Sequence, residues 1–169
     1  AFCYKIPDGK GPCGNVQSEL TAYNFAGDYT AWFYNGENHN IGPEKLTETD
    51  GTRLPVMTVK AGDKHYMAIH EACLETGAPL VLQSKGGESL FSVASKPTSL
   101  SPGYTSAWRV VLYGTTPGVL TDSHLLELLN PDPDSRYDFS WVKPGLAVWD
   151  WRINGAVWDG FTYGMSYPS

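Results

Sequence analysis

The chain has 169 residues and a formal net charge of −6, with 18% charged, 41% hydrophobic and 13% aromatic residues. This length is enough for one ordinary domain with a hydrophobic core, and eighteen glycines and twelve prolines are typical of a β-rich chain with many turns. The acidic balance, without a stripe of Lys and Arg, argues against a nucleic-acid partner, because phosphate binding requires clustered basic side chains.

The first apolar alternation predicts a strand over residues 1–6 (AFCYKI), with Phe2, Tyr4 and Ile6 on one face. Alternation returns at residues 18–25, and a hairpin is the simplest way to join the two runs. The chain begins inside this pattern with neither an initiator Met nor a signal peptide, which predicts a piece of a longer protein. No stretch is long and apolar enough to span a membrane.

An aromatic strand is predicted at residues 30–34 (TAWFY), followed by a polar loop over residues 35–50. Loops of this length in compact domains are often functional. The polar side chains around His39 either reach a sugar or a metal, or belong to a solvated loop.

Residues 65–74 (HYMAIHEACL) have the period-2 pattern of a half-buried strand and are expected to form a hairpin with residues 54–59. Glu71 continues the parity of Met67 and Ile69, which places a carboxylate at the inner end of this strand. An unpaired buried carboxylate is costly, so it should hold a cation, a basic side chain or several donors. Glu71 is therefore either a metal ligand, or a side chain that caps a loop or forms an ion pair with a nearby Lys or Arg.

Further strands are predicted at residues 79–83, 89–95 and 106–113. The last of them, SAWRVVLY, has two largely apolar faces, which suits a central strand of a two-layer stack. Arg109 interrupts one face. It either pairs with an acid such as Glu71, or lays its stem along the sheet while its head reaches water.

A domain boundary is predicted near residue 135. Residues 125–129 (LLELL) fit a helical turn or a strand, and Asn130-Pro131 ends whichever forms. The following PDPDS is typical of an extended, solvated linker.

An apolar strand is predicted beyond the linker, where it ends in Trp149, Asp150 and Trp151. An indole face packs well against the C–H face of a sugar ring, and a carboxylate accepts hydrogen bonds from sugar hydroxyls. The alternative is that the two tryptophans only fill space between packed layers.

The three cysteines, Cys3, Cys13 and Cys73, lack paired C-x-x-C spacing, which argues against a zinc knuckle. Cys3 and Cys13 either bridge across a hairpin or remain free thiols. The metalloprotease, P-loop and nucleophile-elbow patterns are all absent from the sequence.

Three blocks together resemble glycoside hydrolase family 97: LPVMTVKAGDKHYMAIHEACL with APLVLQ, then TSAWRVVLYG, then SWVKPGLAVWDWR. The likeness covers nearly the whole chain and is strongest at residues 55–83, 106–130 and 139–164. The family contains α-glucosidases and α-galactosidases, mostly bacterial and exported. Its members have a large N-terminal β-sandwich, a central (β/α)8 barrel and a small C-terminal β domain.

The resemblance implies an all-β fold, an antiparallel two-layer β-sandwich that is part of a larger one. It implies that residues 1–134 are the C-terminal part of the N-terminal sandwich domain. Residues 135–169 are then the linker and the first strand of a truncated (β/α)8 barrel. The strand ending at Trp149, Asp150 and Trp151 is placed at the substrate end of that barrel.

In the family, the glutamate of an (I/T)-x-E-A-x-L block contributes to a calcium site beside the active site, and only Glu71 matches that position. The site is shared, because calcium needs about six to eight oxygen ligands and the family takes several of them from its barrel. The catalytic acid and base come from later barrel strands, and no position here matches them. The resemblance therefore implies an inactive piece of a calcium-dependent, exo-acting α-glycosidase, periplasmic or secreted, whose substrate is an α-linked oligosaccharide.

Two other functions remain open beside this one: a free-standing carbohydrate-binding sandwich, favoured by the aromatic content, and a purely structural β domain. The lone strand after the linker favours the glycosidase. The sequence does not distinguish a glucoside from a galactoside substrate, or a retaining from an inverting mechanism, and it does not indicate an oligomeric state.

Overall fold

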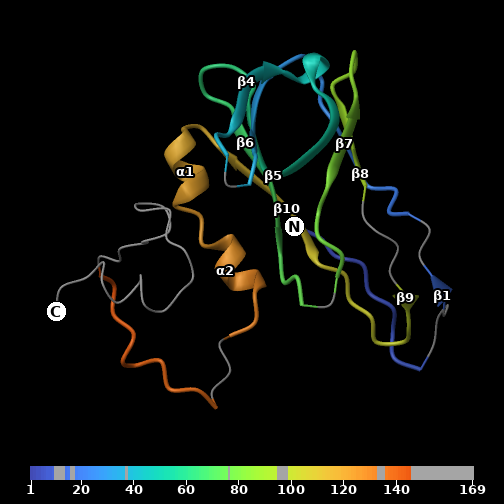
Figure 1. Ribbon diagram of the computed structural model, residues 1–169, viewed down its shortest axis with the longest axis vertical. Helices are drawn as coiled ribbons and strands as arrows, with labels where there is room; N and C mark the ends of the chain where they lie inside the picture. The colour runs from blue at the N-terminus through green and yellow to red at the C-terminus, as the bar shows by residue number, and fades with distance from the viewer. Residues whose placement is uncertain are drawn as a thin grey trace, which may run out of the picture. The chain divides into compact units, whose positions relative to one another are not determined.

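The computed structural model describes residues 1–9, 14–15, 18–36, 38–75, 77–94, 99–132 and 136–145. Its contacts divide the chain into two compact units, Ala1–Asp132 and Pro133–Ser169. The first unit is built almost entirely of antiparallel strands, which confirms the predicted all-β class (Figure 1). Its strands are β1 (Gly14–Asn15), β2 (Ala22–Asn24), β3 (Thr30–Tyr34), β4 (Ile41–Lys45), β5 (Asp50–Lys60), β6 (Tyr66–Ala72), β7 (Leu82–Lys85), β8 (Leu90–Val93), β9 (Ser99–Leu100) and β10 (Trp108–Gly114).

The long strand β5 joins the two layers of this unit. Its first residues, Asp50–Arg53, pair with β7, and its last, Met57–Lys60, pair with both β6 and β3. Among the described residues the strands follow the order β10-β6-β5-β7-β8-β2, with β3 and β4 branching from β5. The predicted hairpin of β5 and β6 is confirmed, with Met57 opposite Ile69.

The main core lies between the two halves of this sheet. Alternation on β3 sends Ala31 and Phe33 into the core, and β5 contributes Met57 and Val59 from its second half. Residues of β6, β7 and β8 close the same cluster, and the ring of Phe33 lies 5.8 Å from that of Phe91. The buried cluster consists of Ala31, Phe33, Leu46, Met57, Val59, Ile69, Leu80, Leu82, Phe91 and Val93.

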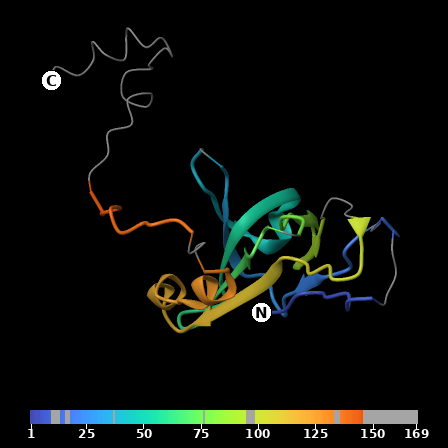
Figure 2. The same ribbon diagram turned by 90° about the horizontal axis from the view of Figure 1, so that it is seen from below.

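Two short helices, α1 (Pro117–Thr121) and α2 (Leu125–Leu129), lie beside β6 and β10 in both views (Figures 1 and 2). Residues 125–129 are therefore helical, one of the two forms that their pattern allowed. The helices cover the outer face of β10, where Val110 and Leu112 are buried.

Three strand-level predictions are wrong. Residues 1–6 do not pair with residues 18–25: Phe2 bridges Arg109, whereas β2 pairs with β8. The strand β10 is not central but ends the sheet order, and the helices account for its second apolar face. Residues 35–50 are not one long loop.

That segment contains β4 and a 3₁₀ helix, η1 (Leu46–Glu48), before β5 begins at Asp50. Leu46 is fully buried in the core and anchors the turn between the two strands. The side chain of Glu48 accepts a hydrogen bond from the N–H of Lys45 at 3.0 Å, which caps the start of η1.

The second unit is described over residues 136–145, where Val142 N–H donates to the carbonyl of Phe139 in a turn. The predicted barrel strand, which is expected to end in Trp149, Asp150 and Trp151, lies outside the described residues.

Candidate functional site

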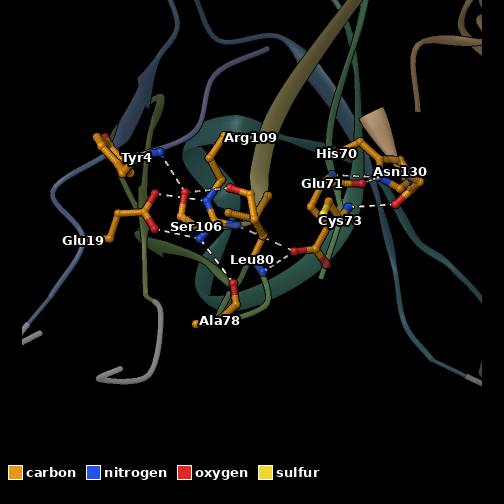
Figure 3. A network of polar contacts seen from close by, with 11 residues as sticks. Tyr4, Glu19, His70, Glu71, Cys73, Ala78, Leu80, Ser106, Arg109 and Asn130 are labelled. Carbon is orange, nitrogen blue, oxygen red and sulfur yellow. Dashed lines mark hydrogen bonds and ion pairs between the residues drawn. The ribbon is translucent and has the colours of Figure 1, made fainter. Parts of the chain in front are cut away.

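The most distinctive polar feature of the first unit is a buried arginine, Arg109, on β10. The residue is only 1% exposed. Its charged head therefore does not reach water, which rules out the second of the two alternatives that the sequence left open for Arg109. In the β6–β10 ladder it stands directly opposite Glu71. Its Nη1 atom lies 3.8 Å from Glu71 Oε2, which confirms the predicted pairing of Arg109 with Glu71 (Figure 3).

The stronger partner of Arg109 is Glu19, from the segment before β2. Arg109 Nε donates to Glu19 Oε1 at 3.0 Å, and Nη2 donates to Oε2 at 2.7 Å, in a bidentate pair. Burial alone would lower the pKa of Arg109, but the hydrogen bonds and charge of Glu19, with the charge of Glu71, raise it above its ordinary value. The guanidinium therefore stays charged inside the sandwich.

The loop between β6 and β7 is fastened to the same charges. The N–H of Leu80 donates to Glu71 Oε2, and Arg109 Nη2 donates to the carbonyl of Ala78 at 3.4 Å (Figure 3). Glu19, Glu71 and Arg109 form what we call the Arg109 network. It holds together the segment before β2, the end of β6, the β6–β7 loop and the start of β10.

A second polar link ties the end of β6 to the end of α2. Cys73 has a positive φ of 54°, and its N–H donates to Asn130 Oδ1 at 2.8 Å. Asn130 also donates from Nδ2 to the carbonyl of Leu126 at 2.7 Å. Asn130, at the C-terminal end of α2, is thereby tied to Cys73, which lies two residues after Glu71 in the sequence (Figure 3).

Tyr23 of β2 lies beside the Arg109 network. Burial raises the pKa of Tyr23 from its ordinary value of 10.0 to about 12, against the charge of Arg109, which lowers it. Its hydroxyl oxygen is buried and makes no hydrogen bond within the described part of the chain. A buried hydroxyl without a partner costs stability.

We expect Tyr23→Phe to remove the part of the pH dependence of the unfolding free energy that the Tyr23 hydroxyl causes. Between pH 10 and 12 the folded protein keeps the Tyr23 proton that the unfolded chain releases, so the free energy of unfolding falls as the pH rises. Urea unfolding should show a smaller fall over this range in Tyr23→Phe than in the wild type, with equal or higher stability at pH 7. An identical pH profile for the two proteins would contradict this account.

Chemically, the Arg109 network is suited to holding charged groups in place. Both carboxylates share one guanidinium, so neither is arranged as a free proton donor or nucleophile. Within the described ranges, no three His, Cys, Asp or Glu side chains are grouped to hold a metal ion.

The other predicted site residues are placed as follows. Trp149, Asp150 and Trp151 lie outside the described residues. His39 is exposed, and its carbonyl accepts a hydrogen bond from Asn35 at 3.2 Å. Sequence reasoning missed Glu19, which lies 90 residues from Arg109 along the chain and carries no local signal.

The two cysteines that the structure describes, Cys3 and Cys73, are free thiols; Cys13 lies outside the described residues. No helix in the described part of the chain is long and apolar enough to cross a membrane.

Two curated proteins with similar sequences carry the same kind of name. A curated retaining alpha-galactosidase of Bacteroides thetaiotaomicron is 27% identical in an alignment 171 residues long, and the match covers 85% of this chain and 26% of that protein. A probable retaining alpha-galactosidase of Streptomyces bingchenggensis is 27% identical in an alignment 175 residues long, and the match covers 92% of this chain and 25% of that protein. The chain thus spans about a quarter of the length of these relatives.

Solved structures show the same fold. A glycoside hydrolase family 97 enzyme from Pseudoalteromonas sp. strain K8, in complex with acarbose, aligns with a TM-score of 0.71 at 24% identity. The alignment covers 85% of this chain and 23% of that one. A variant of the enzyme in complex with panose gives the same values.

The family model described as glycosyl-hydrolase 97 N-terminal matches residues 1–131, which is most of the chain and nearly all of its first unit. The match includes the Arg109 network and the β-sandwich that carries it. This chain therefore belongs to the glycosyl-hydrolase 97 family and matches its N-terminal domain.

Proposed function

We propose that this chain is part of the N-terminal β-sandwich of an exo-acting α-glycosidase that removes terminal α-linked sugars from oligosaccharides. The observation that carries the proposal is the match of the family model to residues 1–131. The names of the two curated relatives, both retaining alpha-galactosidases, favour an α-galactoside as substrate. The complexes of the Pseudoalteromonas enzyme with acarbose and panose support an oligosaccharide ligand.

We propose further that the chain is inactive by itself. Glycoside hydrolysis needs one carboxyl group to protonate the leaving oxygen and a second on the other face of the sugar. Glu19 and Glu71, the carboxylates of the Arg109 network, are both engaged by Arg109. Their arrangement supports a positioning role in the sandwich.

The test is hydrolysis by the full-length gene product. It should release nitrophenol from nitrophenyl α-galactoside or from the α-glucoside, and a chelator should reduce the rate. The 169-residue chain, assayed in parallel, should release none. A full-length protein that turns over neither substrate would overturn the proposed function.

Calcium dependence belongs to the same proposal. Glu71 is proposed as one ligand of a shared calcium site. Its Oε2 is used by Leu80 and Arg109, and no hydrogen bond reaches its Oε1 from the described residues. Calcium takes about six to eight oxygen ligands, so the remaining ligands would come from other parts of the enzyme.

We therefore expect isothermal titration of calcium into the 169-residue chain to give no saturable heat. In the full-length enzyme, Glu71→Gln should raise the calcium concentration needed for half-maximal activity by about 10- to 100-fold. Glu127→Gln is the control, because Glu127 is a carboxylate on the surface of α2 that pairs only with His124 among the described residues. A micromolar site in the chain alone would contradict the shared site.

A periplasmic or secreted location is also part of the proposal, since it rests on the family resemblance. Fractionation of cells that express the full-length gene would test it.

A further inference from the structure

The outer face of β3 carries a pocket of about 370 Å³ that the Arg109 network does not use. Because side chains alternate along a strand, Trp32 and Tyr34 point away from the core that holds Ala31 and Phe33. We call this cavity the β3 pocket. Its lining includes Trp32, Tyr34, Asn40, Pro55, Val56 and Thr58.

Irregular pairing on both sides of β3 shapes the β3 pocket. On β5, Met57 pairs with Phe33 but Leu54 pairs with Tyr34, so Pro55 and Val56 are extra residues. On β4, the register shifts between the partners of Ala31 and Phe33. Bulges of this kind re-aim side chains and are frequent beside binding sites.

The shift in register on β4 lies directly opposite Trp32. On β4, Gly42 and Pro43 together stand opposite the single residue Trp32, and Gly42 has a φ of 115°. A Cβ at this position would lie 2.6 Å from the carbonyl oxygen of Ala31 and 3.1 Å from Trp32 Cδ1. A side chain at position 42 would therefore displace the indole, so the glycine allows β4 to lie against it.

The chemistry of the lining is aromatic, polar and uncharged. None of the described residues that line the β3 pocket is an acid or a base. The indole of Trp32 and the phenol of Tyr34, which is 47% exposed, offer broad apolar surfaces. Asn40 supplies both a donor and an acceptor, and Thr58 supplies a hydroxyl.

We propose that the β3 pocket binds a neutral sugar ring. A pyranose has an apolar C–H face that suits an indole and a rim of hydroxyl groups that suits an amide and a hydroxyl. An anionic ligand would find no basic partner in the lining, and a purely apolar ligand would leave Asn40 and Thr58 unpaired. The site is separate from the Arg109 network and does not depend on hydrolysis by the parent enzyme.

The test is sugar binding to the 169-residue chain by titration calorimetry and ligand-observed NMR. The probes are maltotriose and raffinose, both neutral, with trigalacturonic acid as the charged counterpart. We expect a dissociation constant on the order of 1 mM for a neutral trisaccharide and no binding of the acid. Trp32→Ala should weaken binding about tenfold.

The matched control is Tyr113→Ala, which removes an aromatic ring that is 56% exposed on β10 and does not line the β3 pocket. Its affinity should equal that of the wild type. Because Trp32→Ala can also disturb folding, Asn40→Ala and Thr58→Val provide milder tests, each expected to weaken binding about threefold to tenfold.

Two outcomes would overturn the inference: a wild-type chain that binds neither neutral sugar, or pocket variants that bind as the wild type does. Failure here is distinguishable from failure of the proposed function. The first is measured as binding to the 169-residue chain, the second as turnover by the full-length enzyme.

Discussion

Replacement of Arg109 by Met should lower the free energy of unfolding of the chain by about 3–5 kcal/mol. The substitution keeps most of the side-chain volume but removes the cation from between Glu19 and Glu71. Both carboxylate side chains are only 12% exposed, so two buried negative charges would be left without their partner. Urea unfolding followed by circular dichroism measures the loss.

The matched control is Lys60→Gln, which removes a cation paired with Asp63 at 3.8 Å on the surface. That change should cost less than about 1 kcal/mol, because exposed ion pairs contribute little. Neutralising the acids as well, by Glu19→Gln and Glu71→Gln in the Arg109→Met background, should restore part of the lost stability. A cost for Arg109→Met no larger than that for Lys60→Gln would contradict the role assigned to the network.

The contact between Arg109 and Glu71 could be predicted because both residues lie on strong strand patterns. Glu71 stands at the end of its strand, on the face that alternation assigns to the interior, and a buried carboxylate requires a partner such as the arginine that interrupts the apolar pattern of β10. Neither argument reaches Glu19. The segment from Ser18 to Thr21 lies outside any strand, and its position depends on the packing of elements distant in sequence.

The errors in the strand predictions have a related cause. A hairpin between residues 1–6 and 18–25 is the most local pairing, yet the structure pairs the N-terminal segment with β10, about a hundred residues later. The strand β4 was missed because its sequence contains Gly42 and Pro43 and is flanked by polar residues, a composition typical of a loop. Glycine and proline usually mark loops, but here they form part of a bulge beside Trp32.

A substitution of Gly77 in the β6–β7 loop should also lower the stability of the fold strongly. A Cβ at this position would overlap with the backbone nitrogen of Ala107, just before β10. The backbone cannot give way as a flexible side chain does. Gly77→Ala should therefore lower the free energy of unfolding by about 3 kcal/mol, at the upper end of the cost of overpacking.

The control for Gly77→Ala is Gly118→Ala in α1, where an added Cβ meets nothing within 4 Å. That change should leave stability unchanged or raise it by up to about 1 kcal/mol, because alanine favours helix more than glycine does. The close approach of Gly77 to Ala107 also fixes the loop that carries Leu80 and Ala78. The same variant should consequently loosen their hydrogen bonds to Glu71 and Arg109 and increase amide exchange at Leu80. Unchanged exchange at Leu80 in a destabilised Gly77→Ala protein would mean that the loop is held by Glu71 alone.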